Sequence, residues 1–77
     1  MTATDVVAML EEAIQAAPGK LAPESTLEGL DGWDSMGMVL FMGLVNERVG
    51  IELSVYDVRG CATPAAIASL IEGRRAK

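Results

Sequence analysis

The tetrapeptide Asp34-Ser35-Met36-Gly37 carries more chemical information than any other segment, because it stands where a loop meets an apolar helix. A serine at or near the first residue of a helix directs its hydroxyl toward free backbone N–H groups and the positive end of the helix dipole. That environment favours a phosphate ester on the serine oxygen. The alternative is that Ser35 is only an N-cap, which is the commoner use of serine at such positions.

The composition excludes the usual forms of catalysis and metal binding by this chain. The 77 residues include no histidine and one cysteine, Cys61. Histidine is the commonest general base and metal ligand, so Ser-His catalysis and histidine-based metal sites are excluded. One cysteine can form neither a zinc site nor an internal disulfide, which fits a reducing cytoplasm. We expect no enzymatic activity and no bound metal, with Cys61 packed as a small hydrophobe rather than acting as a reactive thiol.

Charge and hydropathy limit the partners of the chain. Eleven acidic and six basic residues give a formal charge of −5 without a basic patch, so no nucleic-acid binding is expected. Arg74, Arg75 and Lys77 are predicted to form a solvated, frayed tail. The longest uncharged apolar run, Met36 to Val45, has ten residues. A membrane span needs about 20 residues, and acidic residues near the start are unlike a signal peptide. A soluble cytoplasmic protein without membrane insertion is expected.

Helices must position Ser35, and the first is predicted from about Thr4 to Ala17. Thr4 is the expected cap, and Pro18-Gly19 the expected stop. A loop without clear periodicity follows from Pro18 to Asp34, which is long for so small a domain. Three apolar side chains are expected to hold this loop on the core: Leu21, Leu27 and Leu30.

Three further helices complete a predicted all-α fold, a small four-helix bundle of three longer helices and one short helix in a single domain, 1–77. The second is expected from Ser35 to about Arg48, stopping at Gly50. Residues 51–56 alternate like a strand but have no second strand to pair with, so a connector is predicted. The third helix is expected over Val55–Arg59, capped by Ser54. The last begins at Thr63-Pro64, presents Ala66, Ile67, Leu70 and Ile71, and closes at Gly73.

The second helix is apolar on nearly every side. At about 100° per residue, one half that should face the core contains Met38, Phe41, Leu44 and Val45. An adjacent face contains Met36, Val39, Leu40 and Gly43. A surface helix ordinarily carries charge on such a face. Either this face presents an apolar patch to a partner, or its side chains pack under the long loop.

The whole ordered pattern resembles the acyl and peptidyl carrier proteins. It runs from a helix and a long loop through Asp34-Ser35, an apolar helix, Gly50-Ile51-Glu52 and a short helix to Thr63-Pro64. In that family a phosphopantetheinyl transferase attaches a 4′-phosphopantetheine arm from coenzyme A to the serine, and cargo rides on the arm's thiol as a thioester. The resemblance implies that Ser35 binds this cofactor and that partner enzymes dock beside it. The implied docking residues are Asp34, Met36, Gly37, Val39, Leu40, Gly43 and Glu47.

Within the carriers, Met36-Gly37 and the segment Ser54 to Arg59 look like the D-alanyl carrier proteins. That branch is loaded by adenylate-forming ligases, which implies an aminoacyl cargo and partners that transfer acyl or aminoacyl groups. Gly32-Trp33 departs from it and is more like peptidyl and polyketide carriers. A polyketide or fatty-acyl cargo is therefore the alternative. A different class of function is also possible from the sequence: an unmodified helical adaptor that binds a partner through its apolar second helix. A monomer is expected in either case.

Overall fold

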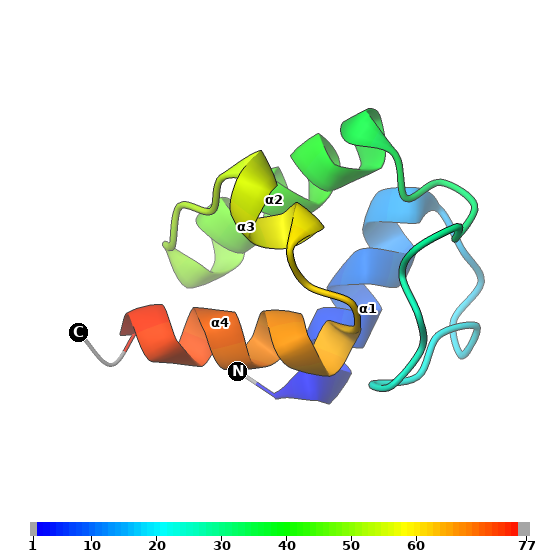
Figure 1. Cartoon of the computed structure of the whole chain (residues 1–77), viewed down its shortest axis with the longest axis horizontal. Coiled ribbons are helices and arrows are strands. Elements are labelled where there is room, and N and C mark those ends of the chain that lie inside the picture. Colours follow the sequence, from blue (N-terminus) through cyan, green and yellow to red (C-terminus); the bar gives the residue numbers. More distant parts are fainter. Residues whose placement is uncertain (1, 76–77) are drawn as a thin grey trace.

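The computed structural model describes residues 2–75, and Figure 1 shows how its four helices are arranged. They are α1 (Ala3–Ile14), α2 (Ser35–Val49), α3 (Val55–Arg59) and α4 (Pro64–Arg75). No strand occurs between residues 2 and 75, which confirms the all-α prediction and the connector before α3. The long loop of residues 15–34 joins the end of α1 to the start of α2.

Helix α1 begins earlier than predicted, because Thr2 rather than Thr4 is its cap. The Thr2 hydroxyl oxygen accepts the Asp5 backbone N–H at 3.2 Å. In return, the Asp5 carboxylate accepts the Thr2 N–H at 3.0 Å, which completes a capping box. Thr4 lies inside the first turn, so its predicted role as cap is wrong.

Helix α1 also ends at Ile14, three residues before the predicted end at Ala17, and Ala17 is exposed. Gln15 adopts a left-handed conformation with φ of 59°, and this stops the helix. The chain then turns back, and the Glu11 carboxylate accepts the backbone N–H of Leu21 at 3.0 Å in a buried hydrogen bond. This hydrogen bond between α1 and the loop accompanies the early end of the helix.

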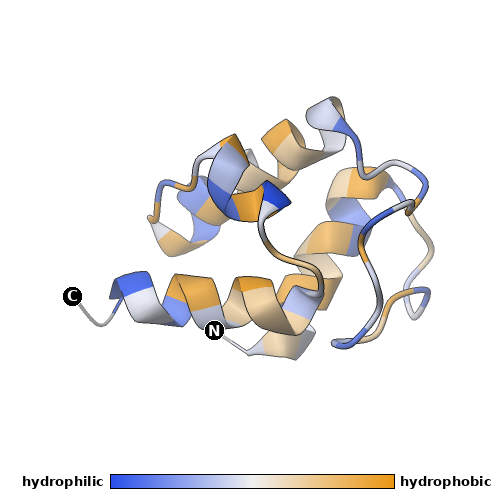
Figure 2. Cartoon of the chain, viewed as in Figure 1, coloured by the Kyte–Doolittle hydropathy of each residue, from blue (hydrophilic) through white to orange (hydrophobic). Residues whose placement is uncertain are grey.

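The core is mainly aliphatic, with Phe41 as its one fully buried aromatic side chain among the described residues, and it draws on every helix. Helix α1 packs against both α2 and α4, and α3 packs against α2. Hydrophobic residues predominate along α2, whereas hydrophilic residues gather in the long loop and at the C-terminal end of α4 (Figure 2). The largest fully buried side chains are Phe41, Leu10, Leu27, Ile67, Ile71, Val6, Val45, Val58 and Pro64. Leu27 comes from the loop, and Leu21 and Leu30 also pack on this core, as predicted.

Helices α2, α3 and α4 begin where the sequence predicted. Gly50, with φ of 78°, ends α2, and the Ser54 hydroxyl accepts the Asp57 N–H at the start of α3. The Thr63 hydroxyl accepts the Ala66 N–H at the start of α4 at 3.2 Å. The predicted end of α4 is wrong, because the helix continues through Gly73.

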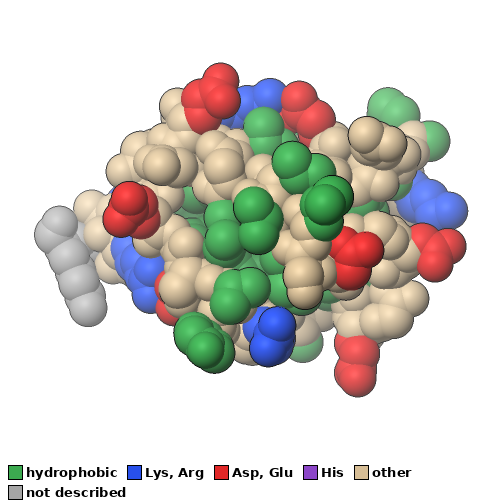
Figure 3. All heavy atoms as spheres, turned by 90° about the horizontal axis from the view of Figure 1, so that it is seen from above, with side chains coloured by type: hydrophobic (Ala, Val, Ile, Leu, Met, Phe, Trp, Pro, Cys, Tyr) green, Lys and Arg blue, Asp and Glu red, His purple; other side chains and the backbone are tan. Residues whose placement is uncertain are grey.

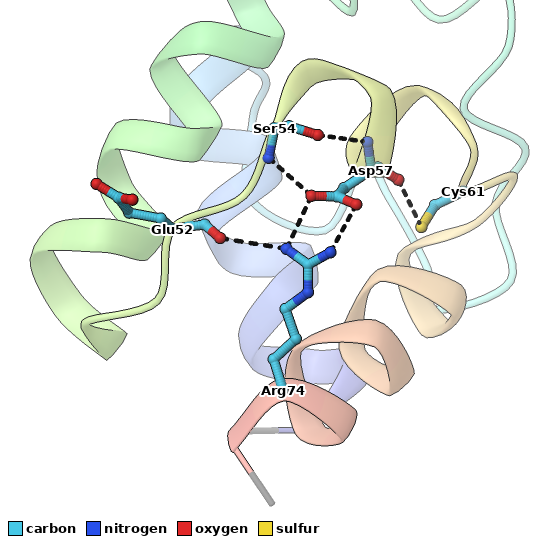
Figure 4. Close-up of polar contacts among 5 residues, drawn as sticks. All are labelled: Glu52, Ser54, Asp57, Cys61 and Arg74. Atoms are coloured by element: carbon cyan, nitrogen blue, oxygen red, sulfur yellow. Dashed lines mark hydrogen bonds and ion pairs between the residues drawn. The ribbon is translucent and has the colours of Figure 1, made fainter. Parts of the chain in front are cut away.

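Arg74 belongs to α4 and forms hydrogen bonds with α3 and the connector before it. Its predicted place in a frayed tail is therefore wrong. Its guanidinium donates two hydrogen bonds to the Asp57 carboxylate, at 2.8 and 2.7 Å, and a third to the Glu52 carbonyl at 3.2 Å. Figure 4 shows this cluster joining the end of α4 to the start of α3. Arg75 pairs with Glu72 within α4, and Lys77 lies outside the described residues.

Candidate functional site

Ser35 is the first residue of α2, and Asp34 is the cap. The Asp34 carboxylate accepts the Gly37 N–H at 2.9 Å, and its carbonyl accepts the Met38 N–H at 2.9 Å. The alternative that Ser35 serves only as the cap is therefore wrong, because Asp34 fills that position. Ser35 is exposed. Its side chain is left available for other chemistry.

Among the chain's four serines, Ser35 is the one that stands exposed at the start of a long helix with an unengaged hydroxyl. The Ser25 hydroxyl accepts the backbone N–H of Ala22 at 2.9 Å. The Ser54 hydroxyl caps α3, and Ser69 lies in the middle of α4. Within residues 2–75 no hydrogen bond involves the Ser35 hydroxyl. The geometry therefore favours Ser35 for a covalent attachment.

The loop before Ser35 is held on both sides. Trp33 packs edge-on against Phe41 of α2, with ring centroids 5.8 Å apart and planes at 74°. Farther back, the Leu27 N–H donates to the Ala62 carbonyl at 2.9 Å, and the Leu27 side chain is fully buried. Ser35 thus projects from a packed framework although a long loop precedes it.

The two predicted faces of α2 are confirmed. Phe41 and Val45 are fully buried, while Met38 and Leu44 are partly buried against the core. On the other face, Met36, Val39 and Leu40 are 72%, 56% and 50% exposed. The alternative that these three side chains pack under the loop is therefore wrong.

The exposed apolar face extends from α2 to α3. Figure 3, seen from the side of α2 and α3, shows hydrophobic side chains gathered across this surface. Tyr56 of α3 is 80% exposed. It was not among the surface residues predicted from the sequence. Its position two residues after the Ser54 cap, and out of step with buried Val58, is the signal that could have indicated it. We call Met36, Val39, Leu40 and Tyr56 the apolar face.

The remaining predicted docking residues divide into two groups. Asp34, Gly43 and Glu47 are exposed, so they are accessible from solvent. Gly37 is buried and adds no surface, so its inclusion among the docking residues is corrected. Its place is explained by close contact with the loop: a Cβ at this position would overlap the carbonyl oxygen of Gly32.

An ion pair between Asp57 and Arg74 connects α3 to the end of α4. The hydrogen bonds from Arg74, followed by the backbone N–H of Ser54, lower the pKa of Asp57 from 3.8 to about 2. The carboxylate is therefore ionised under ordinary conditions and holds α3 against the end of α4 (Figure 4). Tyr56 of the same helix is exposed.

Cys61 lines a solvent-open cleft of about 470 Å³ together with Trp33, Met38 and Arg59. Its thiol donates to the Asp57 carbonyl at 3.4 Å. Burial, followed by the Asp57 charge, raises the pKa of the Cys61 thiol. The thiolate, which is the nucleophilic form, is therefore disfavoured, in line with the expected packing role. No group of three or more His, Cys, Asp and Glu that could hold a metal lies within residues 2–75.

The Ser35 site suits a phosphate ester. The hydroxyl is exposed, and in the described part of the chain the backbone N–H groups of Ser35 and Met36 have no hydrogen-bond partner. A phosphate on this oxygen would lie in solvent at the positive end of α2. A family model described as phosphopantetheine attachment site matches residues 4–71. The chain belongs to this family.

As a member of the phosphopantetheine-attachment family, the chain is a carrier protein that holds acyl groups on covalently attached 4′-phosphopantetheine. Carrier domains are modified by phosphopantetheinyl transferases, work with acyl-handling enzymes and are generally not catalytic. The family decides against the unmodified adaptor. No curated protein and no solved structure gave a significant match. None of the helices within residues 2–75 has the length and apolar character to cross a membrane.

Proposed function

We propose that this carrier holds an aminoacyl group as a thioester on an arm attached at Ser35, and that an adenylate-forming ligase loads it. The observation that carries the proposal is the exposed, unengaged Ser35 hydroxyl at the start of α2, beside apolar side chains that the rest of residues 2–75 leaves exposed. The arm supplies a terminal thiol for the thioester. Tethering the cargo raises its effective concentration at each partner enzyme in turn.

Attachment of the arm needs help from a transferase. Ser35 Oγ forms a bond to the phosphorus that bears pantetheine in coenzyme A, and adenosine 3′,5′-bisphosphate departs. The serine proton goes to a base of the transferase, because this chain has no histidine and a free serine hydroxyl is a weak nucleophile. The chain contributes an accessible oxygen and a docking surface. The single cysteine is consistent with action in a reducing cytoplasm.

Three features support a small aminoacyl cargo. The segment from Ser54 to Arg59, with the Met36-Gly37 pair, resembles the D-alanyl carriers. Leu40 puts an apolar side chain where acidic residues are common in fatty-acid carriers. The core is closed by fully buried side chains such as Phe41, so admitting a long acyl chain would require displacing close-packed groups.

The attachment proposal is tested by intact-mass spectrometry. The purified chain is treated with coenzyme A and a broad-specificity phosphopantetheinyl transferase, and one added arm is expected. Ser35→Ala should abolish the addition, whereas the matched control Ser69→Ala, at an exposed position within α4, should not affect it. An arm found on another residue, or never found, would overturn the assignment of Ser35.

The cargo is tested separately. The loaded protein is isolated from its native host with thioesters preserved, and the bound group is released together with the arm and weighed. An amino acid or aminoacyl group is expected as the principal species. A nitrogen-free fatty or polyketide acyl group would contradict the aminoacyl cargo, while the carrier assignment would stand.

A further inference from the structure

The solvent-open cleft of about 470 Å³ lies within reach of Ser35. Two of its lining residues, Trp33 and Met38, stand two residues before and three residues after Ser35. Three residues of helix rise only about 4.5 Å, whereas the arm continues from its phosphate through a pantoyl, a β-alanyl and a cysteamine unit. The thiol end of an arm on Ser35 therefore reaches the cleft, whose volume falls in the range of about 300–1,000 Å³ that is typical of small-molecule sites.

Two segments joined by a hydrogen bond form this cleft. The Leu27 N–H of the long loop donates to the Ala62 carbonyl, which follows α3, at 2.9 Å. The loop contributes Glu28 to the lining, and the last residue of α3 contributes Arg59. Each segment thus brings one charged side chain, the two are of opposite sign, and both are exposed to solvent.

Arg59 is the one arginine within residues 2–75 that has no acidic partner. The other three, Arg48, Arg74 and Arg75, each form an ion pair. In the same part of the chain, no hydrogen bond or ion pair involves the side chain of Glu28. The chain has 11 acidic residues against 6 basic ones, so a shortage of carboxylates does not explain the unpaired guanidinium. The cleft therefore offers both a cation and an anion to a ligand.

These two charges select among the groups that the arm could carry. A hydrocarbon acyl group would cover both charges without a partner, which costs free energy. A simple aminoacyl group such as alanyl offers its α-ammonium to Glu28 and leaves Arg59 unpaired. A dicarboxylic acyl group such as succinyl offers a carboxylate to Arg59 and leaves Glu28 unpaired. An aspartyl or glutamyl group attached through its α-carboxyl carries both an ammonium and a carboxylate.

We propose that the cleft binds the cargo of the chain's own arm and that this cargo is an acidic amino acid, aspartyl or glutamyl. Its α-ammonium lies against Glu28 and its side-chain carboxylate lies against Arg59. The inference rests on the proposed attachment at Ser35 and narrows the proposed aminoacyl cargo to one class. Each exposed ion pair is weak by itself, but the tether keeps the cargo at a high effective concentration beside the cleft.

The single thiol of the chain does not compete for a thioester held in this cleft. Cys61 lines the cleft, and its thiol donates to the Asp57 carbonyl at 3.4 Å. Burial, followed by the Asp57 charge, raises the pKa of this thiol, so the thiolate that would take the cargo is disfavoured. The cleft can therefore hold the cargo without losing it to the protein.

The test uses four arms whose cargoes differ in charge. Coenzyme A analogues carry an aspartyl, alanyl, succinyl or propionyl group through an amide in place of the thioester, so that the cargo is not hydrolysed. Aspartyl has both charges, alanyl only the ammonium, succinyl only the carboxylate, and propionyl neither. A broad-specificity phosphopantetheinyl transferase attaches each arm to the isotope-labelled chain. Nuclear magnetic resonance then measures how far the backbone amide signals of Gly60, Cys61 and Ala62 move relative to the chain with an unacylated arm.

On the wild-type chain, the aspartyl arm should displace these signals at least about threefold farther than the propionyl arm, because each exposed ion pair can shift an equilibrium by up to about fivefold. Arg59→Gln should make the aspartyl and alanyl arms equal, and Glu28→Gln should make the aspartyl and succinyl arms equal. The matched controls Arg75→Gln and Glu24→Gln remove the same charges at exposed positions outside the cleft. They should leave the differences between the arms unchanged.

Three outcomes of this comparison would overturn the proposal: equal displacement by all four arms, no displacement by any of them, or an order of arms that persists in both cleft variants. The comparison on the wild-type chain needs no substitution, so it remains decisive if a variant fails to fold. If no arm attaches at Ser35, the proposed attachment fails and the cleft proposal fails with it. If the arms attach and the cleft signals do not respond, the cleft proposal fails alone.

The group isolated from the native host provides a second decision. An acidic amino acid is expected as its principal species. Another aminoacyl group would overturn the assignment of an acidic cargo and leave the proposed function standing, whereas a nitrogen-free acyl group would contradict both.

Discussion

Replacing Leu40 with glutamate tests whether the apolar face docks partner enzymes. Leu40 is 50% exposed, so about half of its side chain remains for a partner to cover. Full burial of a leucine contributes about 1.5–3 kcal/mol, and the remaining half would contribute about 0.8–1.5 kcal/mol. At about 1.4 kcal/mol per tenfold, losing this contact should weaken docking by about four- to thirteenfold. Covering the new carboxylate adds a further cost.

The assay measures KM of a phosphopantetheinyl transferase for the carrier, because any enzyme that reaches Ser35 must cover the neighbouring face. Leu40→Glu should raise KM at least about fourfold with helicity retained, since the residue is half exposed. Ser69→Glu, which places the same charge on an exposed position of α4, is the matched control and should leave KM unchanged. KM of the wild-type chain should depend weakly on salt, because exposed ion pairs contribute little.

Three results would refute this reasoning. Unfolding of Leu40→Glu, seen by circular dichroism, would mean that Leu40 belongs to the core and that the face is wrongly assigned. A folded variant with unchanged KM would place docking elsewhere on the molecule. A steep rise of the wild-type KM with salt would show that charges such as Glu47 dominate over the apolar face.

The remaining predictions concern stability and reactivity. The pKa of Asp57 is lowered from 3.8 to about 2 on folding, so its pair with Arg74 stabilises the fold above pH 3.8 and that stability is lost as the pH falls toward 2. In urea unfolding across this window, Asp57→Asn should remove that part of the acid sensitivity; an unchanged profile would contradict the pair's role. Leu27→Ala should lower the free energy of unfolding by about 2–5 kcal/mol, because Leu27 is 1% exposed. A loss below about 1 kcal/mol would contradict its anchoring of the loop. Cys61 should react with iodoacetamide more slowly than a free cysteine at pH 8, because burial raises its pKa.

Most helix boundaries could be predicted because their signals are local. The Asp34 cap, the Gly50 stop and the Thr63-Pro64 start each act through hydrogen bonds or dihedral angles within a few residues. The start of α1 was equally readable, since Thr2 and Asp5 have the spacing of a capping box. Gly73 was misread because a glycine permits a helix end but does not compel one.

The end of α1 at Ile14 and the place of Arg74 could not be predicted in this way. Each involves groups distant along the chain: Glu11 holds Leu21 across the loop, and Arg74 reaches Asp57 from the next helix. Local helix propensity predicts that α1 continues to Ala17, and it indicates no partner for Arg74 at the basic end of α4. Contacts that form only after the chain has folded decided both.

By itself, the sequence determined that a serine begins an apolar helix behind an aspartate, within the ordered pattern of a carrier protein. The periodicity of α2 also determined which of its sides enters the core. Only the tertiary structure decided that the other side stays uncovered, because that depends on where the long loop lies. It also decided that Gly37 is a packing residue rather than a surface one, since the Gly32 carbonyl occupies the space that a Cβ would need.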